Sequence, residues 1–184
     1  SIFYSPNATL ELTADGVQNG TEIPLTFSKS GPGGDVLQRN PYLNGYSAFK
    51  IDAKDFAKIP DAVKGQVAIV VRDDNSKIVD VTGVQLWGVL DALYPYDGQL
   101  GVTWDGSTPT LSVWAPTAQS VNLNLFESSD SSNAQEFPMQ WDSKTGVWTV
   151  TGKADWKSKF YLYEVNVYVP SNGKIETNLV TDPY

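Results

Sequence analysis

Short stretches of alternating hydrophobic and polar residues follow one another along this chain, and turn residues separate them. Such a pattern is typical of β-sandwich domains. In the first half, residues 9–13 alternate up to a turn at Asp15-Gly16. Asn19-Gly20 then predicts a tight two-residue turn, because both residues tolerate a positive φ, and residues 21–27 follow as the returning strand.

The rest of the first half predicts one more extended segment, one helix and one hairpin. Residues 46–51 are expected to be extended. Residues 52–59 offer an N-cap Asp, helix-forming residues and a stop before Pro60, which predicts a short helix. Residues 65–72 and 77–84 are apolar runs on either side of four polar residues, so they predict a hairpin.

The second half shows the strand pattern more clearly. Residues 110–115 place Leu111, Val113 and Ala115 on one face, and Val121, Leu123 and Leu125 alternate with asparagines. The longest expected strand, residues 160–169, has apolar or aromatic residues at every second position. The further expected strands are residues 137–141, 147–151 and 174–180.

A turn-rich stretch within residues 90–100 divides the two sets of strands. We therefore predict an all-β chain of two immunoglobulin-like antiparallel β-sandwich domains with one or two short helices. The first domain is expected over residues 1–98 and the second over residues 99–184. The connector is apolar and aromatic rather than rich in Gly and Ser, which favours domains that pack together.

Composition narrows the chemistry that this chain can perform. The formal net charge is −8, so the phosphates of nucleic acid and anionic membrane surfaces are poor partners. The apolar runs are too short to cross a membrane. The sequence contains no Cys and no His, which excludes disulfides, thiolate zinc sites, Cys nucleophiles and Ser-His pairs. The side chains that remain available for chemistry are carboxylates, Lys, Tyr and Ser.

One segment carries a family resemblance. Leu111-Ser112-Val113-Trp114-Ala115-Pro116-Thr117-Ala118, followed by Gly146-Val147-Trp148, Phe160-Tyr161-Leu162-Tyr163 and Thr181-Asp182-Pro183-Tyr184, resembles the family 48 carbohydrate-binding module. Residues 80–94 resemble the end of the domain that precedes this module in pullulanases and limit dextrinases. Together the two resemblances cover most of the chain and indicate the N-terminal region of a starch debranching enzyme.

The resemblance implies a parent enzyme that hydrolyses α-1,6-glucosidic bonds in starch, pullulan or glycogen. It implies no catalytic residue and no metal ligand in this chain, because the family's catalytic acids lie in a separate barrel. The expected partners are the parent's own C-terminal catalytic (β/α)8 domain and α-glucan oligosaccharides. No cofactor is expected here, although calcium is possible in the parent, and an extracellular or cell-surface location is expected. The alternative is a free-standing starch-binding or adhesin-type surface protein, against which the end at Asp182-Pro183-Tyr184 argues.

The six tryptophans are the candidates for stacking against a sugar ring. Trp114 and Trp148 lie in regular strands and are expected to fill the core. Trp141 adjoins a polar turn and Trp156 lies in a polar segment, so each is either a glucan platform or a residue that packs between the domains or is simply exposed on the surface. Trp87 and Trp104 are expected to pack near the domain junction.

Carboxylates do not form a convincing pair in the sequence. Asp73-Asp74 and Asp142 lie in predicted turns and Glu164 lies in a predicted strand, so solvent exposure explains them. No D-x-[DN]-x-[DN]-G calcium loop is present. The sequence therefore predicts an accessory module rather than a catalyst.

Overall fold

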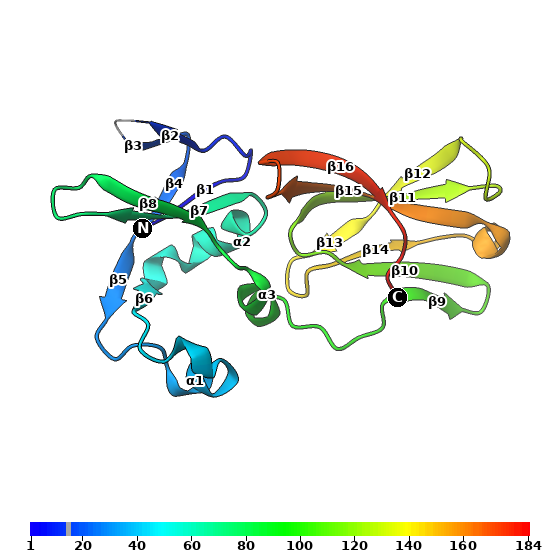
Figure 1. Cartoon of the computed structure of the whole chain (residues 1–184). Helices are drawn as coiled ribbons and strands as arrows, with labels where there is room; N and C mark the ends of the chain where they lie inside the picture. Colours follow the sequence, from blue (N-terminus) through cyan, green and yellow to red (C-terminus); the bar gives the residue numbers. More distant parts are fainter. Residues whose placement is uncertain (14–15) are drawn as a thin grey trace. The chain divides into compact units, whose positions relative to one another are not determined.

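The computed structural model describes residues 1–13 and 16–184, which form two compact units (Figure 1). Unit 1 comprises Ser1–Ser5, Thr9–Ala62 and Val67–Val84, and unit 2 comprises Pro6–Ala8, Val63–Gln66 and Gln85–Tyr184. Both units consist mainly of strands in antiparallel sheets with a few short helices, which confirms the predicted fold class.

Unit 1 is built on a four-stranded sheet with the order β4-β1-β7-β8. Two further sheets have two strands each, β2 with β3 and β5 with β6. The strands are β1 (Ile2–Ser5), β2 (Glu11–Thr13), β3 (Gly16–Gln18), β4 (Thr21–Ile23), β5 (Leu25–Ser28), β6 (Ala48–Ile51), β7 (Gln66–Arg72) and β8 (Ile78–Gly83). Strands β7 and β8 form the hairpin that the sequence predicts.

The hairpin predicted about Asn19-Gly20 is wrong in its pairing. Asn19 does have a positive φ of 58°, but the strands on its two sides pair elsewhere, β3 with β2 and β4 with β1. The predicted strand over residues 21–27 is split at Pro24, whose missing N–H cannot donate to a sheet. The turn predicted at Asp15-Gly16 begins outside the described residues.

The helices of unit 1 are short. They are α1 (Gly34–Arg39), the 3-10 helices η1 (Pro41–Leu43) and η2 (Ala53–Lys58), and α2 (Ile59–Ala62). The predicted helix over residues 52–59 is found, but it does not stop before Pro60. Pro60 lies in the first turn of α2, where its missing N–H costs no helical hydrogen bond.

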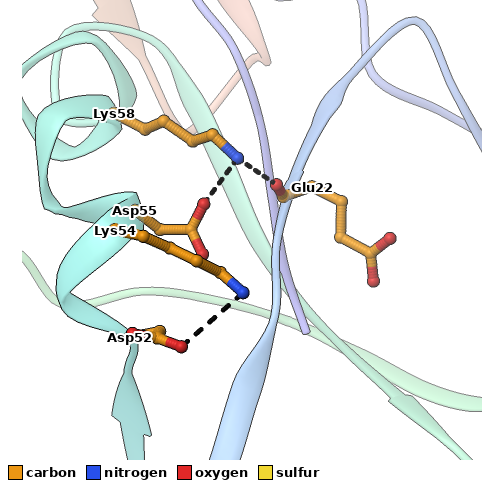
Figure 2. A network of polar contacts seen from close by, with 5 residues as sticks. All are labelled: Glu22, Asp52, Lys54, Asp55 and Lys58. Carbon is orange, nitrogen blue, oxygen red and sulfur yellow. Dashed lines mark hydrogen bonds and ion pairs between the residues drawn. The ribbon is translucent and has the colours of Figure 1, made fainter.

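Lys58 links η2 to the sheet of unit 1, and its ammonium also pairs with a buried carboxylate, as Figure 2 shows. The Asp55 side chain is buried, and its Oδ1 lies 2.7 Å from Lys58 Nζ. Lys58 Nζ also donates to the main-chain oxygen of Glu22 in β4, at 3.2 Å. By contrast, the pair of Lys54 and Asp52 is exposed at 3.6 Å. Lys58 therefore joins η2 to β4 while it neutralises a buried carboxylate, whereas Lys54 only pairs with an exposed neighbour along the chain.

Unit 2 is a sandwich of two four-stranded sheets, with strand orders β13-β14-β10-β9 and β12-β11-β15-β16 (Figure 1). One short α-helix, α3 (Trp87–Leu93), and one 3-10 helix, η3 (Ala154–Ser158), accompany the strands. The strands are β9 (Gly101–Asp105), β10 (Thr108–Trp114), β11 (Ala118–Phe126), β12 (Ala134–Pro138), β13 (Gln140–Asp142), β14 (Val147–Thr151), β15 (Phe160–Val169) and β16 (Lys174–Val180).

The core of unit 2 takes side chains from both sheets. Leu111 and Val113 come from β10, Leu123 comes from β11, and Tyr163 comes from β15. The alternation in the sequence predicts these positions because successive strand residues point to opposite faces. The two sheets therefore bury one continuous apolar layer between them.

Asp182 fastens the end of the chain to the sandwich. Its Oδ2 accepts hydrogen bonds from the hydroxyls of Tyr161, at 2.6 Å, and Tyr163, at 3.3 Å. Its Oδ1 accepts from the backbone N–H of Tyr184, at 3.0 Å. Gly101, with φ of 77°, faces this segment, and a Cβ there would lie 3.3 Å from Tyr184 Cβ. One carboxylate therefore holds residues 182–184 against β15 and the start of β9.

None of the helices within residues 1–13 and 16–184 has the length and apolar character needed to cross a membrane.

Candidate functional site

Trp156 is the first of the two tryptophans that the sequence singles out, and the structure places it in the core of unit 2. Its side chain is only 8% exposed. Its ring lies 4.6 Å from that of Phe137, and it packs so closely on Gly152 that a Cβ there would clash. The polar segment around Trp156 hides this burial, because Phe137 is remote in sequence. This burial favours a packing role for Trp156 over a glucan platform.

Trp141, the second candidate, is half-buried and makes aromatic contacts. Its ring centroid is 5.0 Å from that of Trp148 and 5.7 Å from that of Tyr94. The ammonium of Lys64 lies 4.0 Å from the centroid of the Trp141 ring. An indole surrounded in this way offers little free face to a sugar. Glucan binding by Trp141 or Trp156 stays a prediction.

Beside Trp156 the surface of unit 2 is hollowed into a cavity of about 230 Å³, which we call the Trp104 groove. Trp104 comes from β9, Trp156 and Lys157 come from η3, and Tyr161 comes from β15. Whole-ligand pockets usually measure ~300–1,000 Å³. The smaller volume suits contact with one part of an extended ligand better than enclosure of a complete one.

Trp104 supplies the exposed ring that the two predicted tryptophans lack. It is 45% exposed and forms one wall of the Trp104 groove, with buried Trp156 beneath. The face of an indole carries partial negative charge, which attracts the weakly positive C–H groups on one side of a glucose ring. The sequence analysis expects Trp104 at the domain junction. Its polar neighbours Thr103 and Asp105 are the signal of exposure that the sequence offered.

Two lysines on the rim give the Trp104 groove its polar groups. Lys159 forms an ion pair with Glu127, so its ammonium is held in place. Lys157 is exposed and has no hydrogen bond or ion pair to another described side chain. Its three N–H groups are therefore available as donors to the hydroxyl oxygens of a sugar.

Tyr161 forms the end of the groove and is fixed in position. Its hydroxyl donates to Asp182 Oδ2, as described above. Burial raises the pKa of Tyr161 above its usual range, and the hydrogen bond to Asp182 raises it further. The phenol is therefore a neutral donor at physiological pH, and its ring is held rigidly beside the opening.

Other exposed aromatic and acidic side chains offer less for ligand binding. Trp87 is 58% exposed on α3, but it lines neither this groove nor any other described cavity, and its indole N–H faces Gln85 at 3.4 Å. Among the described residues, no three Asp, Glu, His or Cys side chains gather as metal ligands. Asp142 accepts from Lys144 N and Thr145 Oγ1, both at 2.9 Å, in a turn, and these bonds lower the pKa of its carboxyl.

The fold and this groove define a class of protein, an all-β accessory chain with an aromatic surface suited to carbohydrate. Comparison with known families is more specific. Residues 1–92 match the Pullulanase N2 domain, and residues 99–184 match Carbohydrate-binding module 48 (Isoamylase N-terminal domain). The chain belongs to the Pullulanase N2 domain family and carries a family 48 carbohydrate-binding module, as the sequence predicts.

Individual relatives agree with this assignment. Over its whole length the chain is 37% identical to "Pullulanase 1, chloroplastic" of Arabidopsis thaliana, of which it covers 19%. It is 34% identical to a Klebsiella pneumoniae pullulanase, of which it covers 17%. A crystal structure of Klebsiella pneumoniae pullulanase complexed with maltotriose is 32% identical, with a TM-score of 0.89 over 100% of this chain and 17% of that one. The pullulanase structure from Klebsiella oxytoca is 31% identical with the same TM-score. The chain thus spans less than a fifth of these relatives.

Proposed function

We propose that this chain is a non-catalytic accessory region of a pullulanase-type enzyme that debranches α-1,6-linked glucans, and that unit 2 holds an α-glucan chain at the Trp104 groove. One observation carries the binding part of the proposal. Trp104 presents an exposed indole beside free donors of Lys157, on a module whose family is named for carbohydrate binding.

The expected affinity is low. Stacking of one sugar ring on an indole replaces contacts with water, so its net gain in binding free energy is small. Each hydrogen bond that is exchanged for one with water contributes only ~0.5–1.5 kcal/mol. Such contacts support a Kd of ~0.1–10 mM. A weak site of this kind does not capture glucan tightly but raises the fraction of time that a tethered catalytic domain spends near its polymer.

The second part of the proposal is that a C-terminal catalytic (β/α)8 domain of the parent enzyme is the partner of this chain. The relatives are pullulanases of which this region forms 17–19%, which supports a parent enzyme with a separate catalytic domain. The parent lacking residues 1–184 should hydrolyse a short branched oligosaccharide, if its barrel stays folded, and should act less well on polymeric pullulan. Equal loss on both substrates would indicate a scaffold role alone.

Affinity electrophoresis tests the binding directly. The purified chain should be retarded in a gel that contains amylopectin, relative to its migration without polymer. Trp104→Ala should remove most of the retardation, whereas Trp87→Ala, which removes a more exposed indole outside the groove, should not. Equal retardation of both variants would contradict the groove as the binding site.

Two further expectations stay predictions. An extracellular or cell-surface location follows from the resemblance, and fractionation of cells that produce the parent protein tests it. Calcium is possible in the parent, and no cofactor is expected in this chain. The thermal midpoint of the 184-residue chain should therefore be the same with and without a calcium chelator.

A further inference from the structure

Unit 2 has a second, larger cavity, which we call the tyrosine pocket. It measures about 440 Å³ and is lined by the aromatic side chains of Tyr94, Tyr96, Trp114 and Tyr184, together with Asp91. This volume falls within the ~300–1,000 Å³ of ligand pockets, which are usually aromatic with a few convergent polar groups. Its volume and aromatic lining are compatible with contact to a sugar ring.

The rings of the tyrosine pocket are held in place before any ligand arrives. The indole N–H of Trp114 donates to the main-chain oxygen of Tyr94, at 3.1 Å. The Tyr96 hydroxyl donates to the oxygen of Gln99, also at 3.1 Å, and the Tyr96 ring lies so close to Gly98 that a Cβ there would clash. Binding therefore orders few side chains, which lowers its entropic cost.

Asp91 supplies the polar group of the pocket. It lies in α3 and is exposed, and its carboxylate forms no hydrogen bond or ion pair with another described residue. An ionised carboxylate accepts up to four hydrogen bonds and can accept two from one partner. Neighbouring hydroxyls of a glucose ring present two donors side by side. The aromatic rings and this acceptor together match a neutral sugar better than an anion, which Asp91 would repel.

The two cavities are neighbours. Leu100 lines the tyrosine pocket and Val102 lines the Trp104 groove, and two residues of extended chain span at most ~7 Å. Asp182 also joins them, because it binds Tyr184 of the pocket through Oδ1 and Tyr161 of the groove through Oδ2. The two cavities therefore have lining residues two positions apart in the chain and share a contact with Asp182.

We propose that the Trp104 groove and the tyrosine pocket are two parts of one extended site, which binds two stretches of a single α-glucan chain. Asp182 is the positioning residue that fixes their spacing. This inference rests on the proposed binding of glucan at the groove and adds the pocket, the length of the ligand and the role of Asp182. A chain that reaches both parts gains affinity without any stronger individual contact.

Titration of the 184-residue chain with maltotriose and with maltoheptaose tests the extended site. Maltoheptaose, which can reach both parts, should bind about tenfold more tightly than maltotriose. Asp91→Ala and Tyr96→Ala should lower the affinity for maltoheptaose to that for maltotriose and leave the maltotriose affinity of the groove unchanged. Asp105→Ala, which removes an exposed carboxylate on β9 that lines neither cavity, should keep the tenfold preference.

Asp182→Asn tests the positioning role by the same ratio. It keeps one oxygen acceptor but loses the charge that three donors share, so it should reduce the preference for maltoheptaose about threefold or more. Equal affinity of both sugars, or a preference that Asp91→Ala and Tyr96→Ala leave intact, would overturn the extended site while the groove stands. Failure of both sugars to bind the unaltered chain would overturn the groove and the extended site together. Circular dichroism of each variant confirms that unit 2 stays folded.

Discussion

The two units share a strand-rich fold but bury their apolar residues very differently. In unit 2 both sheets contribute to one buried cluster that runs from Leu111 to Tyr163. In unit 1 the described buried cluster consists of Tyr4, Ile23 and Ala62. A continuous layer between two sheets excludes water over a larger area, and burial of that area is the main source of stability. Unit 2 can therefore hold exposed aromatic rings in fixed positions.

Unit 1 depends more on individual polar contacts. Its sheets of two strands place rings such as Phe27 and Phe49 next to each other, with centroids 5.7 Å apart, but both remain exposed. The pair of Asp55 and Lys58 meanwhile connects η2 to β4 (Figure 2). The candidate site therefore lies in unit 2, the unit with the larger buried cluster.

Core truncation should give the largest effect and the clearest contrast. Leu123 is 0% exposed in unit 2 and Ile23 is 1% exposed in unit 1. Replacement of a buried Leu or Ile by Ala costs ~2–5 kcal/mol. Leu123→Ala should reach the upper part of that range, because the rigid layer cannot close the cavity, and Ile23→Ala should reach the lower part. Urea unfolding followed by a probe in each unit measures both, and equal losses would erase the contrast.

Loss of one lysine should affect unit 1 by an intermediate amount. Lys58→Ala leaves the buried carboxylate of Asp55 without its cation, so we expect a loss of ~1–3 kcal/mol, reduced because Lys58 itself is partly exposed. Lys54→Ala is the matched control on the same segment, and its exposed pair should contribute only ~0–1 kcal/mol. Denaturant unfolding of both variants compares them. Equal effects would show that the buried pair does not anchor η2.

Alkaline pH should weaken unit 2 through the Asp182 cluster. Burial, followed by the charge of and hydrogen bonds to Asp182, raises the pKa of Tyr161 and of Tyr163 above the ordinary value near ~10. The unfolded chain then binds fewer protons than the folded chain above pH ~10, so stability is present below that pH and falls as pH rises. Tyr163→Phe should flatten this fall in unfolding free energy. If the unfolding free energy of the variant fell with pH as steeply as that of the unaltered chain, Tyr163 would not be a cause of the fall.

The smallest expected effect on stability belongs to the residue with the largest expected effect on binding. Trp104 is partly exposed on the edge strand β9, so Trp104→Ala should change the unfolding free energy by no more than ~1 kcal/mol while glucan affinity falls about fivefold to tenfold. Parallel calorimetry of melting and of sugar binding separates the two. A loss of stability comparable with that of Leu123→Ala would make Trp104 a core residue instead.

The regular strands could be predicted from the sequence, and the site could not. Strand β15 covers residues 160–169 as predicted, and its residues Tyr161, Tyr163 and Val165, at every second position, pack in the core of unit 2. The burial of Trp156 depends on Phe137 and Gly152, which its local sequence does not reveal, so the sequence leaves its role open. Trp104 was missed because the groove arises only when β9, η3 and β15 meet. The closing Thr181–Tyr184 motif was noticed, but its partners Tyr161 and Tyr163 appear only in the fold.

The central claim is that unit 2 binds α-glucan through the Trp104 groove. The indole N–H signals of the six tryptophans, followed by NMR during titration with maltoheptaose, test it most directly. The account predicts a saturable shift of the Trp104 signal with a Kd of ~0.1–10 mM, while the Trp87 signal stays in place. A Trp104 signal that does not move at tens of millimolar sugar, or that moves no more than that of Trp87, would contradict the claim.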